Sequence, residues 1–167
     1  MHKVYLLVGG NLDNNLAKYE RLFDLLTRYV GKIISKSQFY ESSSWGYESS
    51  HLFINMALCM ETELNPETLI KETQNIESIF GRKNKTQNQY EDRIMDIDII
   101  FYDNIILDIE GLQIPHPRMH LRNFVLYPLN EICSSLRHPI FKKDIATLKH
   151  ECTDKAIVTS VKLECIN

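Results

Sequence analysis

Residues 94–102 read Ile-Met-Asp-Ile-Asp-Ile-Ile-Phe-Tyr, a run in which apolar residues alternate with two acids. Alternation of this kind predicts a β-strand, because successive side chains of a strand point to opposite faces of the sheet. Asp96 and Asp98 are therefore expected on one face. The apolar residues expected on the other face, in the core beneath the helices, are Ile97, Ile99 and Phe101.

Five segments before this run have recognisable patterns of their own. They are strands at Val4–Val8, Ile33–Tyr40 and Phe53–Glu61, an amphipathic helix between Asp13 and Val30, and a second helix that begins after Asn65 and ends near Gly81. Asn65 and Pro66 form a typical helix start, a capping side chain followed by proline. The order strand, helix, strand, strand, helix, strand predicts an α/β (α+β) fold. We expect a ferredoxin-like sandwich, a mainly antiparallel sheet with both helices packed on one face.

The chain after Tyr102 gives weaker signals. Residues 114–117 are rich in turn formers, a helix is expected from Asn123 to Ile132, and no clear pattern follows residue 140. The 167 residues contain no internal repeat and no Pro/Gly/Ser-rich linker. A single domain over 1–167 is therefore expected.

Composition narrows the classes of function. A net charge of −3 disfavours non-specific binding of nucleic acid, which needs a basic surface. The apolar runs have the length of strands, so no membrane span is expected. The cysteines lack metal-ligand spacing and indicate reduced thiols in the cytoplasm. They are Cys59, Cys133, Cys152 and Cys165.

Asp96 and Asp98 are the strongest candidates for a metal site. Two carboxylates side by side on a strand repel each other, and a bound cation would remove that cost. Hard oxygen ligands suit Mg²⁺, which takes one or two carboxylates together with phosphate oxygens and water. The alternative is a solvated sheet face that happens to carry two acids.

The polar segment 82–93 precedes this strand and has neither helix nor strand periodicity. Its basic residues, which could balance a polyphosphate, are Arg82, Lys83, Lys85 and Arg93. Arg93 can contribute only if the chain is still irregular there, because in a regular strand it would face away from Asp96. Within this segment, the loop from Arg82 to Asp92 is expected to be mobile and to order over the site when ligands bind, because it has so few apolar residues.

A second polar cluster, Pro115–Phe124, contains two histidines and two arginines. His116 could donate to a phosphate, and Arg122 could make the bidentate contact that a planar guanidinium favours. The alternative for each residue is a rigid surface turn with solvated charges.

Phe53 and Phe124 are candidate walls for a flat heterocycle, and Asn55 could bond its edge. Both rings could equally be core residues at the ends of elements. Glu77, at the edge of its helix's apolar stripe, is by default a solvated acid. Gly9-Gly10-Asn11 does not match a P-loop, so ATP would have to be held through a metal and arginines.

Five motifs, taken together, are informative about family. They are Gly9-Gly10-Asn11-Leu12, Phe53-Ile54-Asn55, Gln74-Asn75-Ile76-Glu77 with Gly81-Arg82, Arg93-x-x-Asp96-Ile97-Asp98-Ile99, and Ile114-Pro115-His116-Pro117-Arg118-Met119. Over about its first 140 residues the chain resembles the 6-hydroxymethyl-7,8-dihydropterin pyrophosphokinases. The resemblance implies a ferredoxin-like fold and a diphosphokinase of folate biosynthesis. Such an enzyme transfers pyrophosphate from ATP to the hydroxymethyl oxygen of 6-hydroxymethyl-7,8-dihydropterin and releases AMP.

The resemblance also implies a role for each candidate residue. Asp96 and Asp98 would hold two Mg²⁺ ions that bridge the ATP phosphates and, with Arg82 and Arg93, would be the catalytic residues. The pterin pocket would be formed by Ser43, Trp45, Gly46, Phe53, Asn55 and Phe124. The ATP side would be formed by Gln74, Glu77, Arg82, Arg93, His116 and Arg122. ATP and the pterin are thus the expected partners, with no nucleic acid, no membrane and no indication of a protein partner.

Several positions depart from the family pattern. Gly10 stands where a serine is usual, and Asp92 where a proline is common. The prolines that usually precede Trp45 are absent, and Tyr90 stands where a tryptophan is common. Where a second arginine usually follows Arg82, only Lys83 or Lys85 is present, and a lysine cannot make a planar two-pronged contact.

Two other classes of protein share parts of this pattern. A small regulatory module that binds metabolites can have the same order of strands and helices, because fold does not dictate function. A metal-dependent nucleotidyl-transfer domain could share the acid pair. The first would not need paired acids beside phosphate-type donors, and the second would not need an aromatic slot.

Overall fold

The main sheet combines six strands from both ends of the chain: β1 (His2–Gly10), β2 (Lys32–Lys36), β3 (Phe39–Ser42), β4 (Phe53–Thr62), β5 (Asp96–Tyr102) and β8 (Val158–Val161). The structure, a computed structural model, describes residues 1–81 and 91–165. The strand order is β5-β1-β4-β3-β8, with β2 also paired to β4, and these pairs are antiparallel. The first strand, β1, thus lies in the centre of the sheet between β4 and β5, as in a ferredoxin-like sheet. This arrangement confirms the predicted fold class.

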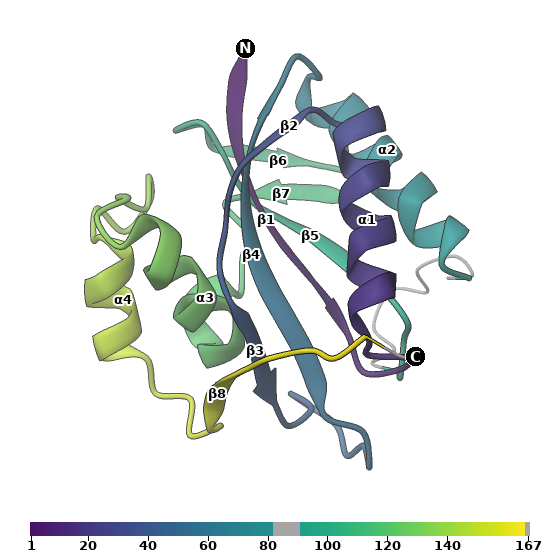
Figure 1. The fold of residues 1–167 in the computed structure, drawn as a ribbon. Coiled ribbons are helices and arrows are strands. Elements are labelled where there is room, and N and C mark those ends of the chain that lie inside the picture. Colours follow the sequence, from purple (N-terminus) through teal and green to yellow (C-terminus); the bar gives the residue numbers. More distant parts are fainter. Residues whose placement is uncertain (82–90, 166–167) are drawn as a thin grey trace.

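Helices cover both faces of this sheet (Figure 1). The helices are α1 (Leu16–Tyr29), α2 (Pro66–Ile79), α3 (Asn123–Cys133) and α4 (Ile145–Glu151), with a short 3-10 turn η1 (Met119–Leu121) before α3. α1 and α2 lie together on one face, as predicted, and α3 and α4 lie on the other. A separate hairpin of β6 (Leu107–Ile109) and β7 (Leu112–Ile114) follows β5.

Alternating residues of the central strands supply two hydrophobic cores. Leu6 and Val8 of β1 pack with α1 and α2, whereas Tyr5 and Leu7 pack with α3 and α4. The start of α2 is as predicted, because the Asn65 side chain accepts a hydrogen bond from Thr68 N at 2.8 Å and a proline follows. The two-sided packing explains why β1 is a continuous apolar run.

The single strand predicted over 33–40 is wrong, because it is divided into β2 and β3 at Ser37. The Ser37 hydroxyl accepts from Ala57 N, and Ser37 N donates to Ala57 O, each at 2.9 Å. The Ser37 hydroxyl thus accepts the hydrogen bond from Ala57 N that a backbone carbonyl would accept in a regular pair of strands. The next amide, Gln38 N, turns away and donates to the Glu131 carboxylate of α3.

The predicted face of Phe101 is also wrong. Ile97 and Ile99 do pack under α1 and α2, but Phe101 belongs to the core under α3 and α4. The register between β1 and β5 shifts between Tyr5 and Leu6, which leaves Ile100 as an extra residue on β5. A bulge of this kind reverses the alternation that follows it.

The last 25 residues, where no clear pattern was expected, contain α4 and β8. β8 pairs with β3, and the chain then runs to the start of α1, where Leu16 N donates to Glu164 O at 3.3 Å (Figure 1). Within the described ranges, none of the helices is long and apolar enough to cross a bilayer.

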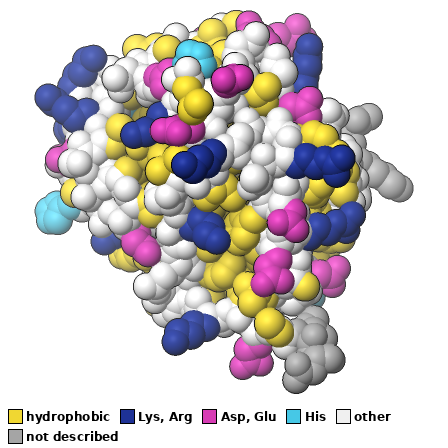
Figure 2. Space-filling model, turned by 45° about the horizontal axis from the view of Figure 1, so that its top comes forward, with side chains coloured by type: hydrophobic (Ala, Val, Ile, Leu, Met, Phe, Trp, Pro, Cys, Tyr) yellow, Lys and Arg dark blue, Asp and Glu magenta, His cyan; other side chains and the backbone are white. Residues whose placement is uncertain are grey.

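Charges of both signs are mixed over the face drawn in Figure 2. Among the side chains coloured there, Lys and Arg alternate with Asp and Glu, and no broad basic patch forms. This distribution agrees with the small net charge of −3.

Candidate active site

A cavity of about 70 Å³ lies on the α3 face of the sheet, where β1 ends and β4, β5 and α3 begin. Its lining combines the two groups of residues that the sequence analysis assigned to different ligands. The predicted pterin residues that line it are Ser43, Trp45, Phe53, Asn55 and Phe124. The predicted metal and phosphate residues that line it are Arg93, Asp96, Asp98 and Arg122. Gly46 is a turn residue with φ of 81° and does not line the cavity.

The register of three strands brings Asn55 and the acid pair together. Gly9 is paired with Asn55 on one side and with Asp96 on the other, and Leu7 is paired with Asp98. A Cβ atom on Gly9 would collide with the backbone and side-chain oxygens of β4, including the Asn55 amide oxygen. Glycine therefore lets the Asn55 side chain lie close against β1, next to the carboxylates.

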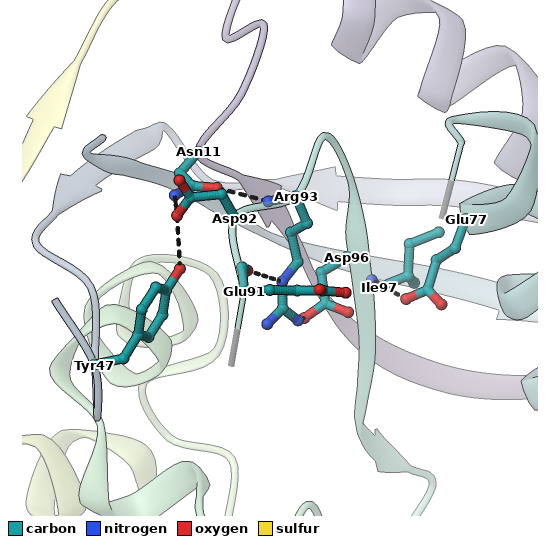
Figure 3. A network of polar contacts seen from close by, with 8 residues as sticks. All are labelled: Asn11, Tyr47, Glu77, Glu91, Asp92, Arg93, Asp96 and Ile97. Atoms are coloured by element: carbon teal, nitrogen blue, oxygen red, sulfur yellow. Dashed lines mark hydrogen bonds and ion pairs between the residues drawn. The ribbon is translucent and has the colours of Figure 1, made fainter. Parts of the chain in front are cut away.

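Arg93 forms an ion pair with Asp96, with Nη1 2.8 Å from Oδ2 (Figure 3). The two side chains are only 15% and 22% exposed. β5 begins at Asp96, so Arg93 precedes the regular strand. The chain is therefore irregular at Arg93, as it has to be if the Arg93 side chain is to lie on the same side as Asp96.

Asn11, which sequence reasoning did not single out beyond its motif, holds the entry to β5 in place. It is 4% exposed, its Oδ1 accepts from Arg93 N at 2.8 Å, and its own N–H donates to Arg93 O at 3.0 Å. Lys18 adds a bond to the next residue, with Nζ 2.8 Å from Ile94 O. Burial lowers the pKa of Lys18 to about 8. The backbone before the acid pair is thus anchored to the end of β1 and to α1.

Asp92 links this entry to the connection between β3 and β4. Its Oδ1 accepts from Asn11 Nδ2 at 2.7 Å and from the Tyr47 hydroxyl at 3.2 Å (Figure 3). It also accepts from Ser49 Oγ at 2.7 Å. Hydrogen bonds from Ser49 and Asn11 lower the pKa of Asp92. A proline, which the resemblance leads us to expect at this position, could not accept these bonds. The departure at position 92 therefore supplies a contact between the two sides of the site.

Glu77 is buried, so its default assignment as a solvated acid is wrong. It is 2% exposed, and its Oε1 accepts from Ile97 N at 2.7 Å (Figure 3). β5 is the outer strand of the sheet, and the N–H of Ile97 points away from β1. Glu77 thus accepts a hydrogen bond from the backbone N–H on the open edge of β5 that lies between Asp96 and Asp98. It lines neither cavity described here.

The wall opposite the sheet is aromatic and cationic. The Arg122 guanidinium carbon lies 4.4 Å from the centroid of the Trp45 ring and 5.5 Å from that of Phe124. Arg122 is 7% exposed, and such contacts favour the charged group over the ring faces. Arg122 therefore lies with the predicted pterin residues in this structure, although the sequence placed it on the ATP side.

The Ser42 hydroxyl is an unused polar group in this cavity. Ser42 is 3% exposed, lines the cavity and is paired in register with Phe53 of β4. Its Oγ is buried and has no hydrogen-bond partner among the described residues. A buried hydroxyl without a partner is costly, and a polar ligand edge would satisfy it.

A second, more open cavity of about 410 Å³ shares Asp98 with the first. It lies between α2, β5 and the β6–β7 hairpin, and His116 and Gln113 are on its wall. Gln74 is exposed and lines neither cavity. Arg82, Lys83, Lys85 and Tyr90, with most of the expected mobile segment, lie outside the described residues.

Among the described residues, Asp96 and Asp98 lie as a pair on β5 and are not part of a larger group of possible metal ligands. In the described ranges, no group of three or more His, Cys, Asp or Glu side chains is arranged to hold a metal ion. A site of two carboxylates fits Mg²⁺ if a phosphorylated ligand and water complete the shell. It does not fit a structural zinc site, which uses four protein ligands.

Comparisons with known proteins identify the family of the chain. The family model of 7,8-dihydro-6-hydroxymethylpterin-pyrophosphokinase (HPPK) matches residues 5–134. A 2-amino-4-hydroxy-6-hydroxymethyldihydropteridine pyrophosphokinase of Porphyromonas gingivalis is 36% identical over 81% of this chain and 93% of its own length. The enzyme of the same name from Aquifex aeolicus is 32% identical over 98% of this chain and 100% of its own length.

Among solved structures, HPPK-DHPS of Plasmodium falciparum with pteroate has a TM-score of 0.71 at 16% identity. The match covers 90% of this chain but only 42% of that one, so this chain spans less than half of that longer protein. At this identity the likeness supports the fold alone.

Proposed function

The chain belongs to the 7,8-dihydro-6-hydroxymethylpterin-pyrophosphokinase family, and on that premise we propose that the cavity between β1, β4, β5 and α3 is its active site. The chain is a diphosphokinase that transfers pyrophosphate from ATP to hydroxymethyldihydropterin in folate biosynthesis. The observation that carries the assignment of the site is that one cavity is lined by Asn55 and the aromatic rings as well as by Asp96 and Asp98. An enzyme that joins these two substrates needs both sets within reach of one reacting centre.

The pterin would occupy the aromatic part of the cavity. Phe53 and Phe124 would flank the flat ring system, with Trp45 and Ser43 closing its outer side. Asn55 offers an amide to the ring edge, and the unpartnered Ser42 hydroxyl offers a second polar group beside it. Gly46 would contribute only through the turn that presents Trp45.

Asp96 and Asp98 would hold Mg²⁺ together with ATP, and the two-ion form expected from the family remains part of this proposal. When bound, the metal would neutralise phosphate charge and orient the triphosphate. The residues fit such a group because they are adjacent on one face and both reach the cavity. Arg93, already paired with Asp96 at 2.8 Å, is placed to share its contacts between that carboxylate and a phosphate oxygen.

The chain's own contribution to the chemistry is position and electrostatics. The hydroxymethyl oxygen attacks the β-phosphorus of ATP, loses its proton, and the bond from that phosphorus to the oxygen of AMP breaks. Asn55 and the rings would fix the oxygen, and Arg93 would stabilise negative charge on the transferred group. Burial of the site under α3 would limit access of water.

The nucleoside of ATP would lie in the second cavity. It has room for a nucleoside at about 410 Å³, it opens toward solvent, and Asp98 connects it to the first cavity. His116 on its wall is the candidate contact to the nucleotide. Gln74, Glu77 and Arg82 are retained as ATP-side candidates from family resemblance alone. We further propose that the chain acts in the cytoplasm, which suits its free thiols at Cys59, Cys133, Cys152 and Cys165.

Calorimetric titration tests the assignment. Asn55→Ala should weaken binding of a pterin analogue by about 1–3 kcal/mol, because a ring-edge bond is lost. It should leave binding of an ATP analogue with Mg²⁺ unchanged. Asp98→Ala should instead lower affinity for the Mg²⁺ nucleotide, and Asp24→Ala, an exposed acid on α1, should change neither. Equal losses for both ligands in Asn55→Ala would refute the proposed pterin pocket.

A further inference from the structure

The segment after α4 lies beyond residue 134, where the match to the family model ends, yet it contacts the elements that form two walls of the cavity, α3 and β3. It leaves α4 at Cys152, passes the start of α3 and becomes β8 (Figure 1). The function described above uses none of its residues.

Asp154 and Asn123 form a reciprocal junction between this segment and α3. The Asp154 carboxylate accepts from the backbone N–H of Asn123, with Oδ2 2.9 Å from N. In return, Asn123 Nδ2 donates to Asp154 O at 2.9 Å and to Ala156 O at 3.3 Å. The second oxygen of Asp154, Oδ1, accepts from Ala156 N at 2.9 Å, so the carboxylate itself is held in place.

This junction caps the start of α3 with a residue that is distant in sequence. The first backbone N–H groups of a helix have no partner within the helix, and a side-chain oxygen usually satisfies one of them. The residue at the N-cap of α3 is Arg122, whose side chain makes no capping hydrogen bond. Asp154, 31 positions after Asn123, supplies the acceptor instead, and its negative charge suits the positive end of the helix.

The capped residue lies between two residues of the cavity wall. Arg122 and Phe124 flank Asn123 in sequence, and both line the cavity. The same segment then pairs with the opposite wall, because Val158 of β8 is in register with Ser42 of β3.

We propose that Asp154 is a positioning residue for the pyrophosphoryl transfer, which acts through Asn123 to hold Arg122 and Phe124 against the pterin. This inference rests on the proposed function, because it takes the cavity as the pterin pocket. Asp154 touches neither substrate. It fixes the first turn of α3, so that the aromatic and cationic wall is in place before the pterin binds.

The matched control is Asp144, which caps α4. Its Oδ1 accepts from Thr147 N at 2.8 Å, so Asp144→Ala removes the same kind of cap from a helix that does not line the cavity. Both alanine variants should lower the melting temperature, because each loses a helix cap. Only Asp154→Ala should alter the pocket. Asp154→Asn, which keeps one acceptor oxygen, should lie between Asp154→Ala and the wild type.

Two readouts on the full chain separate these effects. In calorimetry with Mg²⁺ and a non-hydrolysable ATP analogue present, Asp154→Ala should raise the Kd of a dihydropterin analogue about tenfold, the scale of one lost cap, and Asp144→Ala should not. The Kd of the ATP analogue should change less than about twofold in both variants. Trp45 is the only tryptophan and lies against Arg122, so its emission in the ligand-free protein should change in Asp154→Ala and not in Asp144→Ala.

The inference is overturned if Asp154→Ala binds the pterin analogue like the wild type, or if Asp144→Ala loses the same affinity. Asn55→Ala in the same titration reports on the pocket itself. If Asn55→Ala binds the pterin normally, the proposed pocket is wrong, and Trp45 emission alone then decides whether Asp154 positions that wall. If Asp154→Ala does not fold, Asn123→Ala replaces it, because it removes only the side-chain half of the junction and should give a smaller loss in the same direction.

Discussion

Asp96 and Asp98 are expected to differ sharply in their effect on the stability of the metal-free protein. Repulsion between two adjacent carboxylates alone predicts that removal of either one stabilises the fold. In the structure, however, Asp96 is paired with Arg93 at 2.8 Å, whereas Asp98 has no ion pair with any described residue. Alanine at position 96 removes that pair as well as the repulsion, and alanine at position 98 removes only the repulsion.

The size of each expected change in the free energy of unfolding follows from the contacts and the burial of these side chains. Relief of like-charge repulsion on a strand contributes about 0.2–1 kcal/mol. A charge-assisted hydrogen bond contributes about 1.5–3 kcal/mol. We take the lower end because the side chains of Arg93 and Asp96 are still 15% and 22% exposed to solvent. Asp96→Ala should therefore lower the free energy of unfolding by about 1 kcal/mol, and Asp98→Ala should raise it by about 0.5 kcal/mol.

Urea denaturation without magnesium, followed by circular dichroism, measures this difference. The same variants, assayed for release of AMP with magnesium, should both lose activity, because each removes a proposed metal ligand. Equal shifts in the midpoint of unfolding would refute the reasoning from the Arg93 pair. Wild-type turnover in either variant would refute the metal site.

Other predictions concern groups that support the site. Glu77→Ala should lower the free energy of unfolding by about 2–3 kcal/mol, because it leaves Ile97 N–H buried without its acceptor at 2.7 Å, and Glu77→Gln should lose less in the same denaturation experiment. Asn11→Ala should lower kcat more than it weakens nucleotide binding in steady-state kinetics, because the strand entry that positions Arg93 is released. Burial, and to a lesser extent the charge of His120, lowers the pKa of His138 to about 4. The unfolded chain then binds more protons below about pH 6.5, so stability should fall by about 1–3 kcal/mol between that pH and pH 4, and His138→Asn should flatten this slope in melting curves at a series of pH values.

Much of the fold could be predicted because its signals are local. The helix start at Asn65, the alternation around Asp96 and the apolar run of β1 each depend on residues close in sequence, and the structure confirms them. The strands β6, β7 and β8 are too short for a pattern to emerge. The division at Ser37 depends on a bond to Ala57, which is distant in sequence.

The supporting residues of the site were beyond sequence reasoning for the same reason. Glu77 resembled a solvated acid because its partner, Ile97 N, is on another element. Asn123 resembled an ordinary first residue of a helix, and its partner, Asp154, follows an intervening helix. Each case joins a side chain to a backbone group that becomes available only when a strand edge or a helix start is placed in the fold.

The position of the site on the sheet follows from the register of three strands. On the α3 face, each central strand changes from apolar to polar or small residues toward the same end of the sheet. The changes are from Leu7 to Gly9 in β1, from Ala57 to Asn55 in β4 and, one cross-strand pair earlier, from Ile100 to Asp98 in β5. The bulge at Ile100 also turns Phe101 toward this face, where it fills the core under α3 and α4. The apolar half of the face thus anchors α3, and the polar half beyond it is left for the substrates. A shift of one residue in β4 or β5 would turn the Asn55 amide or the two carboxylates to the opposite face, into the core under α1 and α2, where unpaired polar groups are costly. The same register that completes the core therefore sets the distance between the acid pair and Asn55.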